Sequence, residues 1–215
     1  GSEMCIRDRR VPDDWDITTS ARPEQVKVLF HRTVDTGIQH GTVTVLMDRV
    51  GYEVTTYRID GEYEDSRHPK EVTFTASLQE DLRRRDFTIN AMAYNEEAGL
   101  VDIFGGIEDI SKKVIRCVGD AKERFTEDAL RMMRAVRFAT QLGFFIDPDT
   151  FDAIIRNRER ISIISKERIV DELNKIVLSP KPSIGFDLLD KCGLLPLIFP
   201  ELCALKGVET KEGIG

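Results

Sequence analysis

The spacing of hydrophobic residues changes partway along this chain. Over residues 15 to about 103, short strand-like patterns mix with short helix-like patterns, whereas the apolar positions beyond that stretch recur mostly at helical spacing. No internal repeat interrupts either part. We therefore expect an α/β part followed by an all-helical part, with a boundary near 105–120.

The first part opens with elements that the residue types define well. Residues 15–18 predict a short strand, and hydroxyl residues before Pro23 predict the start of a helix. Residues 41–48 and 52–58 are rich in β-branched residues, which favour strands. With a turn at 50–51, these two runs predict a β-hairpin.

The remainder of the first part is less regular. Residues 60–69 are polar and acidic, and they predict a mobile loop. Residues 78–93 predict a mostly helical segment. Residues 100–103 predict a short strand that ends at the glycine pair 105–106.

The second part has its most regular pattern over residues 127–142. Thr126 is expected to cap this helix, and Gly143 is expected to end it. Three further helices are predicted over 148–158, 165–178 and 183–192.

Composition limits the classes of protein that remain. The chain has 215 residues, 41% hydrophobic, which suffices for one good core or two small ones, and its apolar residues form no run long enough for a membrane span. No secretory signal is visible, and the four cysteines lack ligand-like spacing. Reduced thiols in a cytoplasmic protein are the expected state.

Charge is distributed unevenly. The formal net charge of −7 argues against a general nucleic-acid binder. Between residues 112 and 137, however, eight basic residues face only four acidic ones. This stretch is either a solvated helix face or a local basic surface for a polyanion.

Asp14 and Asp16 form the first candidate site. Residues two apart on a strand face the same side, and two neighbouring carboxylates repel each other unless a cation lies between them. Magnesium prefers such hard oxygen ligands together with substrate phosphates. An isolated D-x-D is more often a turn or a capping pair, so this motif alone is weak evidence.

The second candidate is the run of three arginines that ends at Arg85 and is followed by Asp86. Arginine suits bidentate contact with phosphate. Asp86 is then either a third carboxylate beside a metal or the ion-pair partner that orders an arginine. The alternative is that the three arginines are ordinary charged residues on the protein surface, without a role in phosphate binding.

The third candidate is the acidic and basic face of the helix over 127–142. Asp128 and Arg131 are three residues apart and can pair or point together, offering an acceptor and a fork of donors to the edge of a base. Arg134 and Arg137 are then left for phosphates. A plain salt bridge on an amphipathic helix is the competing interpretation.

Together these residues resemble the class II CCA-adding enzymes (tRNA nucleotidyltransferases) and their bacterial poly(A) polymerase relatives. Five motifs occur in the family's order, which is far more specific than any one of them. They are RVPDDWDI at 10–17, TGIQHGT at 36–42, RRDFTINA at 84–91, DIFGG at 102–106 and RFTEDALRMMRAVRF at 124–138.

The resemblance implies an α+β fold, with a polymerase-β-like nucleotidyltransferase head (a mixed sheet with flanking helices) and an all-helical neck. It implies a catalytic set of Asp14, Asp16 and Asp86, in which Asp14 and Asp16 ligate Mg²⁺. It further implies a nucleotide-binding set in which Arg85 contacts the triphosphate, Asp128 and Arg131 act as an amino-acid template for the base, and Arg134 and Arg137 complete the pocket.

The implied activity is template-independent addition of C and A to the 3′ end of tRNA, from CTP and ATP, with release of pyrophosphate. The implied partners are CTP, ATP and tRNA, with no membrane. A poly(A) polymerase or an A-adding relative is the alternative within this class, and a truncated nucleotide-binding fragment without turnover is the alternative outside it.

The resemblance also implies a domain organisation. We expect a head over 10–110, a nucleotide- and RNA-binding neck over 111–200 and the start of a truncated linker to body and tail over 201–215. Residues 1–9 depart from the family, because Glu3 and Met4 stand where two glycines belong before Arg7 and Asp8. We expect 1–9 to be a tag or a non-native leader.

Overall fold

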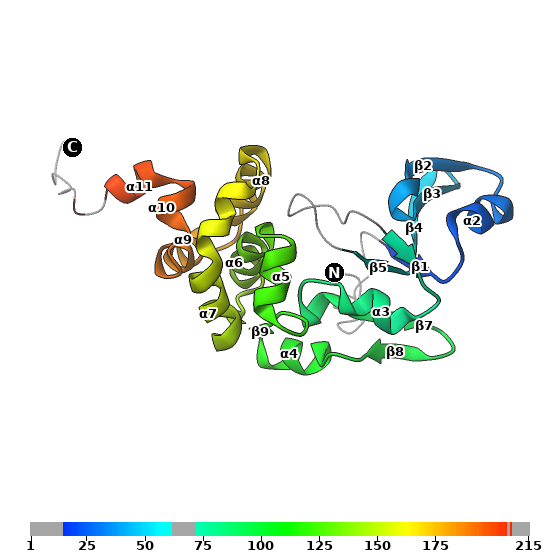
Figure 1. Ribbon diagram of the computed structural model, residues 1–215, viewed down its shortest axis with the longest axis horizontal. Helices are drawn as coiled ribbons and strands as arrows, with labels where there is room; N and C mark the ends of the chain where they lie inside the picture. Colours follow the sequence, from blue (N-terminus) through cyan, green and yellow to red (C-terminus); the bar gives the residue numbers. More distant parts are fainter. Residues whose placement is uncertain (1–14, 62–71, 206, 208–215) are drawn as a thin grey trace. The chain divides into compact units, whose positions relative to one another are not determined.

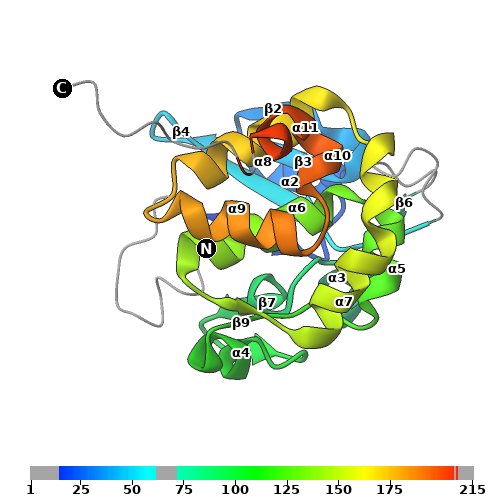
Figure 2. The same ribbon diagram turned by 90° about the vertical axis from the view of Figure 1, so that its left-hand side faces the viewer.

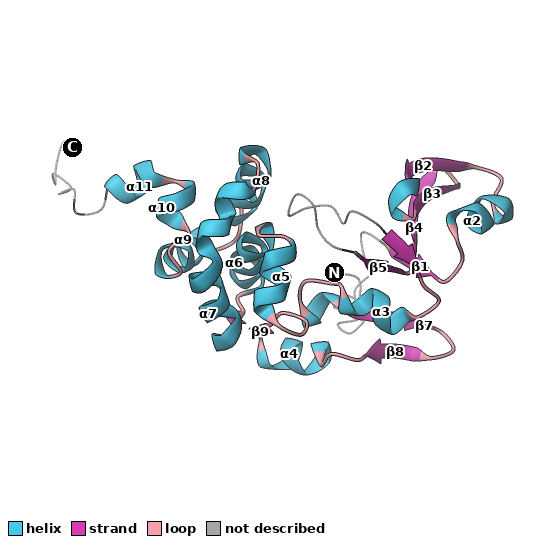
Figure 3. Ribbon diagram, viewed as in Figure 1, coloured by secondary structure: helices cyan, strands magenta, loops and turns pink. Residues whose placement is uncertain are grey.

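The chain folds into two compact units (Figure 1). The computed structural model describes residues 15–61, 72–205 and 207. The head unit extends to residue 112 and includes 116–120, and the helical unit comprises 113–115 and the residues from 121 onwards. As Figure 3 shows, strands concentrate in the head unit and helices in the helical unit.

The head unit begins with a sheet and its covering helix. Its described elements are β1 (Asp16–Thr19), α2 (Pro23–Leu29), β2 (Thr33–Gly37), the 3₁₀ turn η1 (Ile38–His40), β3 (Thr42–Met47), β4 (Val50–Thr56), β5 (Arg58–Asp60), β6 (Val72–Phe74), α3 (Leu78–Arg83), η2 (Thr88–Asn90), β7 (Met92–Asn95), β8 (Gly99–Asp102) and α4 (Gly106–Lys112).

A four-stranded mixed sheet forms the centre of the head unit. Its order is β1-β4-β3-β2, with β1 parallel to β4 and the other neighbours antiparallel. The predicted hairpin is present as β3 and β4. Its turn is formed by Asp48 and Arg49, with φ of 48° and 68°, because two left-handed residues match the twist of a tight hairpin. The predicted turn at 50–51 is therefore wrong, and these residues begin β4.

Strand alternation gives this sheet two different faces. Val43, Val45 and Val54 are buried and pack against Val26 of α2 on one face. Glu53 alternates with Val54 and is exposed, so it points to the opposite face. The first face supplies the hydrophobic core of the sheet, and the second face presents polar side chains.

Two parts of the head unit differ from the sequence prediction. Strand β2 was not predicted, and the turn η1 joins it to β3 through the left-handed Gly41. Residues 78–93 do not form one helix, because the chain turns extended at Phe87, which forms a β-bridge with Cys117. The loop predicted over 60–69 lies mostly outside the described residues.

The helical unit contains a pair of two-residue strands and a set of packed helices. Its described elements are β9 (Val114–Ile115), α5 (Ala121–Glu127), α6 (Leu130–Leu142), β10 (Phe145–Ile146), α7 (Pro148–Asn157), η3 (Arg158–Ile163), α8 (Lys166–Val177), α9 (Pro182–Lys191), α10 (Leu195–Ile198) and α11 (Pro200–Ala204).

Helix α6 is the central element of this unit, and both α8 and α9 pack against it (Figure 2). Met132, Met133 and Val136 of α6 are fully buried, as the helical spacing predicted. The predicted stop is confirmed, because Gly143 adopts a left-handed conformation with φ of 66°. No helix in the described ranges is both long and apolar enough to cross a bilayer.

The predicted start of this helix is wrong. The segment 127–142 is divided between α5 and α6, and Thr126 lies inside α5, where its hydroxyl donates to the carbonyl of Lys122 rather than capping a helix. At the break between the two helices, the carboxylate of Asp128 accepts the amide N–H of Leu130. A short acidic side chain that binds a nearby amide competes with helical continuation.

Gly185 of α9 packs closely against residues of α6 and α8. A Cβ there would lie 2.4 Å from Cγ2 of Ile176 and 2.8 Å from Oγ1 of Thr140. We expect Gly185→Ala to destabilise the helical unit by about 1–2 kcal/mol, because overpacking outweighs the gain in helix propensity. Urea unfolding monitored by circular dichroism measures this loss.

Ser183→Ala provides the control, since Ser183 is exposed on the same helix and should change the free energy of unfolding by less than about 0.5 kcal/mol. Equal stability of Gly185→Ala and wild type would show that α9 does not pack this closely.

Candidate functional site

Asp16 lies at the start of β1, on the polar face of the head sheet. In the parallel pair of β1 and β4 it is opposite Glu53, and side chains at paired positions project from the same face. Both residues are exposed. Asp14, the other half of the predicted pair, lies outside the described residues.

These carboxylates suit a divalent cation. Two anionic side chains on neighbouring strands provide hard oxygen donors, which Mg²⁺ prefers, and their exposure leaves room for phosphate and water ligands. In the part of the chain that the structure describes, no three His, Cys, Asp or Glu residues form a metal-binding group. Asp16 and Glu53 are therefore the candidate ligands among the described residues.

The sequence pattern alone did not single out Glu53 as a candidate ligand. Its alternation with the buried Val54 shows that it faces away from the core, and this much is visible in the sequence. Its position beside Asp16 is not, because the register of two parallel strands distant in sequence depends on the tertiary fold.

Arg85 is held by a buried carboxylate from the preceding helix. Asp81 of α3 is fully buried, and its Oδ2 accepts from Nη2 of Arg85 at 3.5 Å. Its Oδ1 accepts from Nε of Arg84 at 3.2 Å. The spacing of three and four residues places both arginines on the face of the chain that Asp81 occupies.

Asp81 also binds the strand region of the head unit. Its Oδ1 accepts the amide N–H of Arg58 at 3.1 Å, and the side chain of Arg58 donates to the carbonyl of His40. Burial, and then the charge of Asp81, raise the pKa of Tyr57. Arg84 and Arg85 are therefore ordered by a buried carboxylate that is itself fixed to the strands of the head unit.

Asp86 is buried and takes part in local structure. Its Oδ1 accepts the amide N–H of Phe87 at 2.9 Å and an N–H of the Asn90 side chain at 3.4 Å. Its carbonyl accepts the amide N–H of Val118. These contacts order the turn after the arginines, and a catalytic role for Asp86 stays a prediction.

Asp128 and Arg131 lie around the first turn of α6, and each has a separate anchor. Arg131 donates to the carboxylate of Glu127, which also accepts from Arg124 at 2.6 Å. Asp128 accepts from Nη2 of Arg168, on α8, at 2.9 Å. The predicted acceptor and donor fork are thus present at the same end of α6, and their anchors come from different elements.

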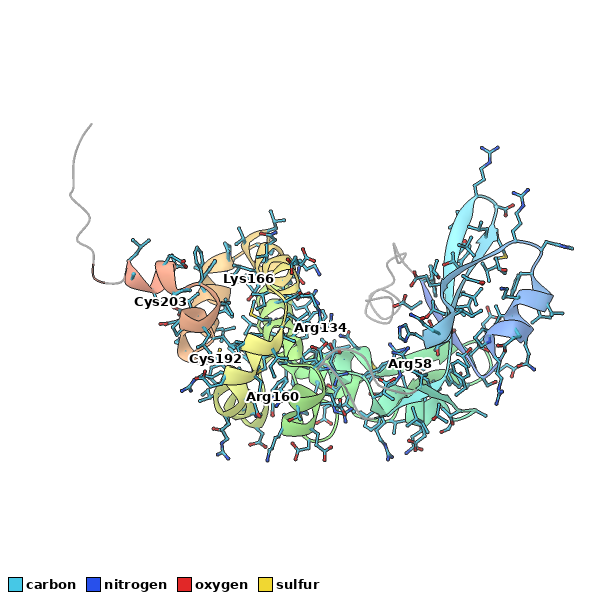
Figure 4. All side chains as sticks on the ribbon, turned by 45° about the horizontal axis from the view of Figure 1, so that its top comes forward. Arg58, Arg134, Arg160, Lys166, Cys192 and Cys203 are labelled. Carbon is cyan, nitrogen blue, oxygen red and sulfur yellow. The ribbon has the colours of Figure 1, made fainter. Side chains whose placement is uncertain are left out.

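The two remaining arginines of α6 differ in their surroundings. Arg137 forms an ion pair with the buried Glu172 of α8, and its guanidinium lies 4.0 Å from the ring centroid of Phe138. Arg134, labelled on α6 in Figure 4, lies 5.3 Å from the same centroid. Arg137 therefore holds α6 to α8, and its predicted contact with nucleotide stays a prediction.

Two family models match the chain. The model described as the poly A polymerase head domain covers residues 5–116. The model described as a probable RNA and SrmB-binding site of polymerase A covers residues 143–206.

Curated relatives with high identity are named CCA-adding enzymes. That of Leuconostoc mesenteroides is 54% identical over 175 residues, which cover 81% of this chain and 44% of that protein. That of Anoxybacillus flavithermus is 51% identical over 205 residues, which cover 94% of this chain and 51% of that protein. The chain spans about half the length of the curated relatives it matches.

Solved structures of similar proteins share the fold. The Bacillus stearothermophilus CCA-adding enzyme in complex with CTP superimposes with a TM-score of 0.82 at 45% identity, over 90% of this chain and 47% of that one. A tRNA nucleotidyltransferase complexed with a primer tRNA and an incoming ATP analogue superimposes with a TM-score of 0.74 at 26% identity, over 99% of this chain and 59% of that one. The polymerase-β-like head and the helical neck predicted from the motifs are confirmed, and the chain belongs to the family of class II CCA-adding enzymes and bacterial poly(A) polymerases.

Proposed function

We propose that this chain is the nucleotidyl-transfer and base-selecting portion of an enzyme that adds C and A to the 3′ end of tRNA, using CTP and ATP and releasing pyrophosphate. The observation that carries the proposal is the pair formed by Asp128 and Arg131, an acceptor and a donor fork that are each held by their own ion-pair partner. Relatives named CCA-adding enzymes support the choice of reaction.

In this proposal the head unit binds the reacting groups. Asp14, Asp16 and Glu53 would hold Mg²⁺, which supplies charge stabilisation at the phosphoryl group and favours ionisation of the attacking hydroxyl. Arg85, ordered by Asp81, binds the triphosphate through its donor fork. Positioning and electrostatics supply most of the acceleration.

The helical unit selects the base. Cytosine and adenine both carry an exocyclic amino group, which donates to an acceptor such as the Asp128 carboxylate. At the corresponding position uracil and guanine carry a carbonyl oxygen, which a carboxylate repels. Arg131 donates to the adjacent ring nitrogen of C or A. Arg134 and Arg137 complete the nucleotide pocket in this proposal.

Addition of A alone, or of poly(A), is the second candidate, and the description of the matching head model favours it. The names of the curated relatives favour CCA addition over it. A cytoplasmic location is part of the proposal, supported by the three free cysteines of the described residues, Cys117, Cys192 and Cys203.

Incorporation of labelled CTP or ATP into tRNA that lacks its 3′ CCA tests the proposal directly. With Mg²⁺ present, we expect two C residues and then one A. Arg131→Ala should lower the preference for CTP and ATP over UTP and GTP by roughly tenfold or more, because Arg131 and Asp128 together make the two-point contact with the base edge, and one good bidentate contact discriminates by about 1–3 kcal/mol. Gel analysis of the extended tRNA measures both results.

Three results would contradict the proposal in different ways. Retained nucleotide binding without incorporation would make this chain a binding fragment. Runs of A without C would support the second candidate. Unchanged base preference in Arg131→Ala would refute the amino-acid template.

A further inference from the structure

Arg168 joins α8 to the break between α5 and α6, where Asp128 of the proposed base-selecting pair lies. It lies in the first turn of α8, forty positions after Asp128, and its Nη2 donates to Oδ2 of Asp128 at 2.9 Å. The two side chains are 21% and 16% exposed, so the pair is only partly solvated. Figure 4 labels Lys166, which begins α8, and Arg134 of α6.

The Asp128 carboxylate is held at both oxygen atoms. Oδ2 accepts from Arg168, and Oδ1 accepts the amide N–H of Leu130 at 3.0 Å. An ionised carboxylate has about four acceptor positions, so each oxygen keeps capacity for another donor. The two contacts therefore restrict the orientation of the carboxylate without using all of its acceptor capacity.

The anchor of Asp128 is independent of the anchor of Arg131. Arg131 is held by Glu127, which lies next to Asp128 in the chain, whereas Asp128 is held from α8. Loss of Arg168 would release one oxygen of the carboxylate and leave only the contact with Leu130. A charge-assisted hydrogen bond of this kind is stronger than a neutral one, so its loss should allow the Asp128 carboxylate to change its orientation.

We propose that Arg168 is a positioning residue for base selection, which fixes the Asp128 carboxylate so that its remaining acceptor positions meet the exocyclic amino group of cytosine or adenine. This proposal rests on the proposed role of Asp128 in nucleotide choice. It predicts that Arg168 acts through Asp128 and has no separate effect on nucleotide affinity.

A double-mutant cycle with Arg168→Met and Asp128→Asn tests this coupling. Competition binding of CTP against UTP, and of ATP against GTP, gives the preference of each variant. We expect Arg168→Met to lower the preference for CTP and ATP by roughly tenfold, as expected for one charge-assisted contact. In the Asp128→Asn background, Arg168→Met should change the preference by less than about twofold.

The conservative variant separates positioning from folding. Arg168→Lys keeps the charge but not the planar fork, so we expect it to restore part of the preference. Arg156→Met serves as the control, because Arg156 also pairs with an acidic residue of the same unit, Asp152, but both are exposed. It should leave the preference unchanged. If Arg168→Met lowers the unfolding temperature, Arg168→Lys supplies the test. A stably folded Arg168→Lys whose preference is no higher than that of Arg168→Met would overturn the proposal.

The other outcomes identify which assignment is at fault. If Asp128→Asn lowers the preference and Arg168→Met does not, Arg168 is not a positioning residue and the role of Asp128 stands. If Arg168→Met has its full effect in the Asp128→Asn background, Arg168 acts elsewhere and the proposal is overturned. If Asp128→Asn leaves the preference unchanged, or if wild type shows no preference, the proposed template function fails and this proposal fails with it.

Discussion

Asp16→Ala is expected to lower nucleotide incorporation by at least about 10³-fold. A bound cation contributes several kcal/mol of transition-state stabilisation, and a loss of about 4 kcal/mol corresponds to this factor. Asp16 is exposed at the start of a strand, so its removal should change the free energy of unfolding by less than about 0.5 kcal/mol. Loss of activity without loss of stability would identify a carboxylate that serves the reaction.

Incorporation of labelled CTP measures the activity of the variant, and urea unfolding of the same preparation measures its stability. Binding of Mn²⁺ gives a further readout that does not depend on turnover. Asp35→Ala is a matched control, because Asp35 belongs to the same sheet and pairs with Lys27 of α2, which covers the opposite face. It should retain activity within about twofold. Activity of Asp16→Ala within a few fold of wild type would refute the metal assignment.

Asp81→Ala is expected to destabilise the head unit by roughly 3–5 kcal/mol, the loss that follows when one partner of a buried ion pair is removed. The change leaves the amide of Arg58 and the guanidinium groups of Arg84 and Arg85 without this acceptor. The loss should lie toward the lower end of that range, since Arg84 and Arg85 are 20% and 29% exposed and reach solvent. Urea unfolding followed by tryptophan fluorescence measures it.

Asp81→Asn separates the charge from the hydrogen bond. It keeps an acceptor for the Arg58 amide, so its stability should lie between that of wild type and that of Asp81→Ala. Glu80→Ala, one residue earlier on the exposed side of α3, should remain within about 0.5 kcal/mol of wild type. Equal stability of Asp81→Ala and Glu80→Ala would contradict the anchoring role assigned to Asp81.

The local pattern of residues was sufficient for several elements. Alternation of β-branched residues predicted strands β3 and β4, and helical spacing predicted α6 up to its stop at Gly143. These patterns depend on residues only a few positions apart, so they can be recognised in the sequence before the fold is known. The break between α5 and α6 was missed because the hydrogen bond from the Leu130 amide to the Asp128 carboxylate competes with helical continuation, and the continuous apolar spacing does not reveal it.

Contacts between distant segments could not be predicted in the same way. Glu53 meets Asp16 across a parallel strand pair, and Arg168 meets Asp128 between two helices. Neither pair has a characteristic spacing in the sequence. Asp81 precedes the arginines by a helical turn, yet its complete burial depends on strands that lie far away in the chain.

By itself, the sequence determined the family, the order of head and neck, and the residue types that the proposed chemistry needs, because these are carried by local motifs in a fixed order. Only the tertiary structure decided which carboxylate lies beside Asp16 and which cation holds Asp128. Register and helix packing, which come from the burial of many side chains at once, bring those partners together.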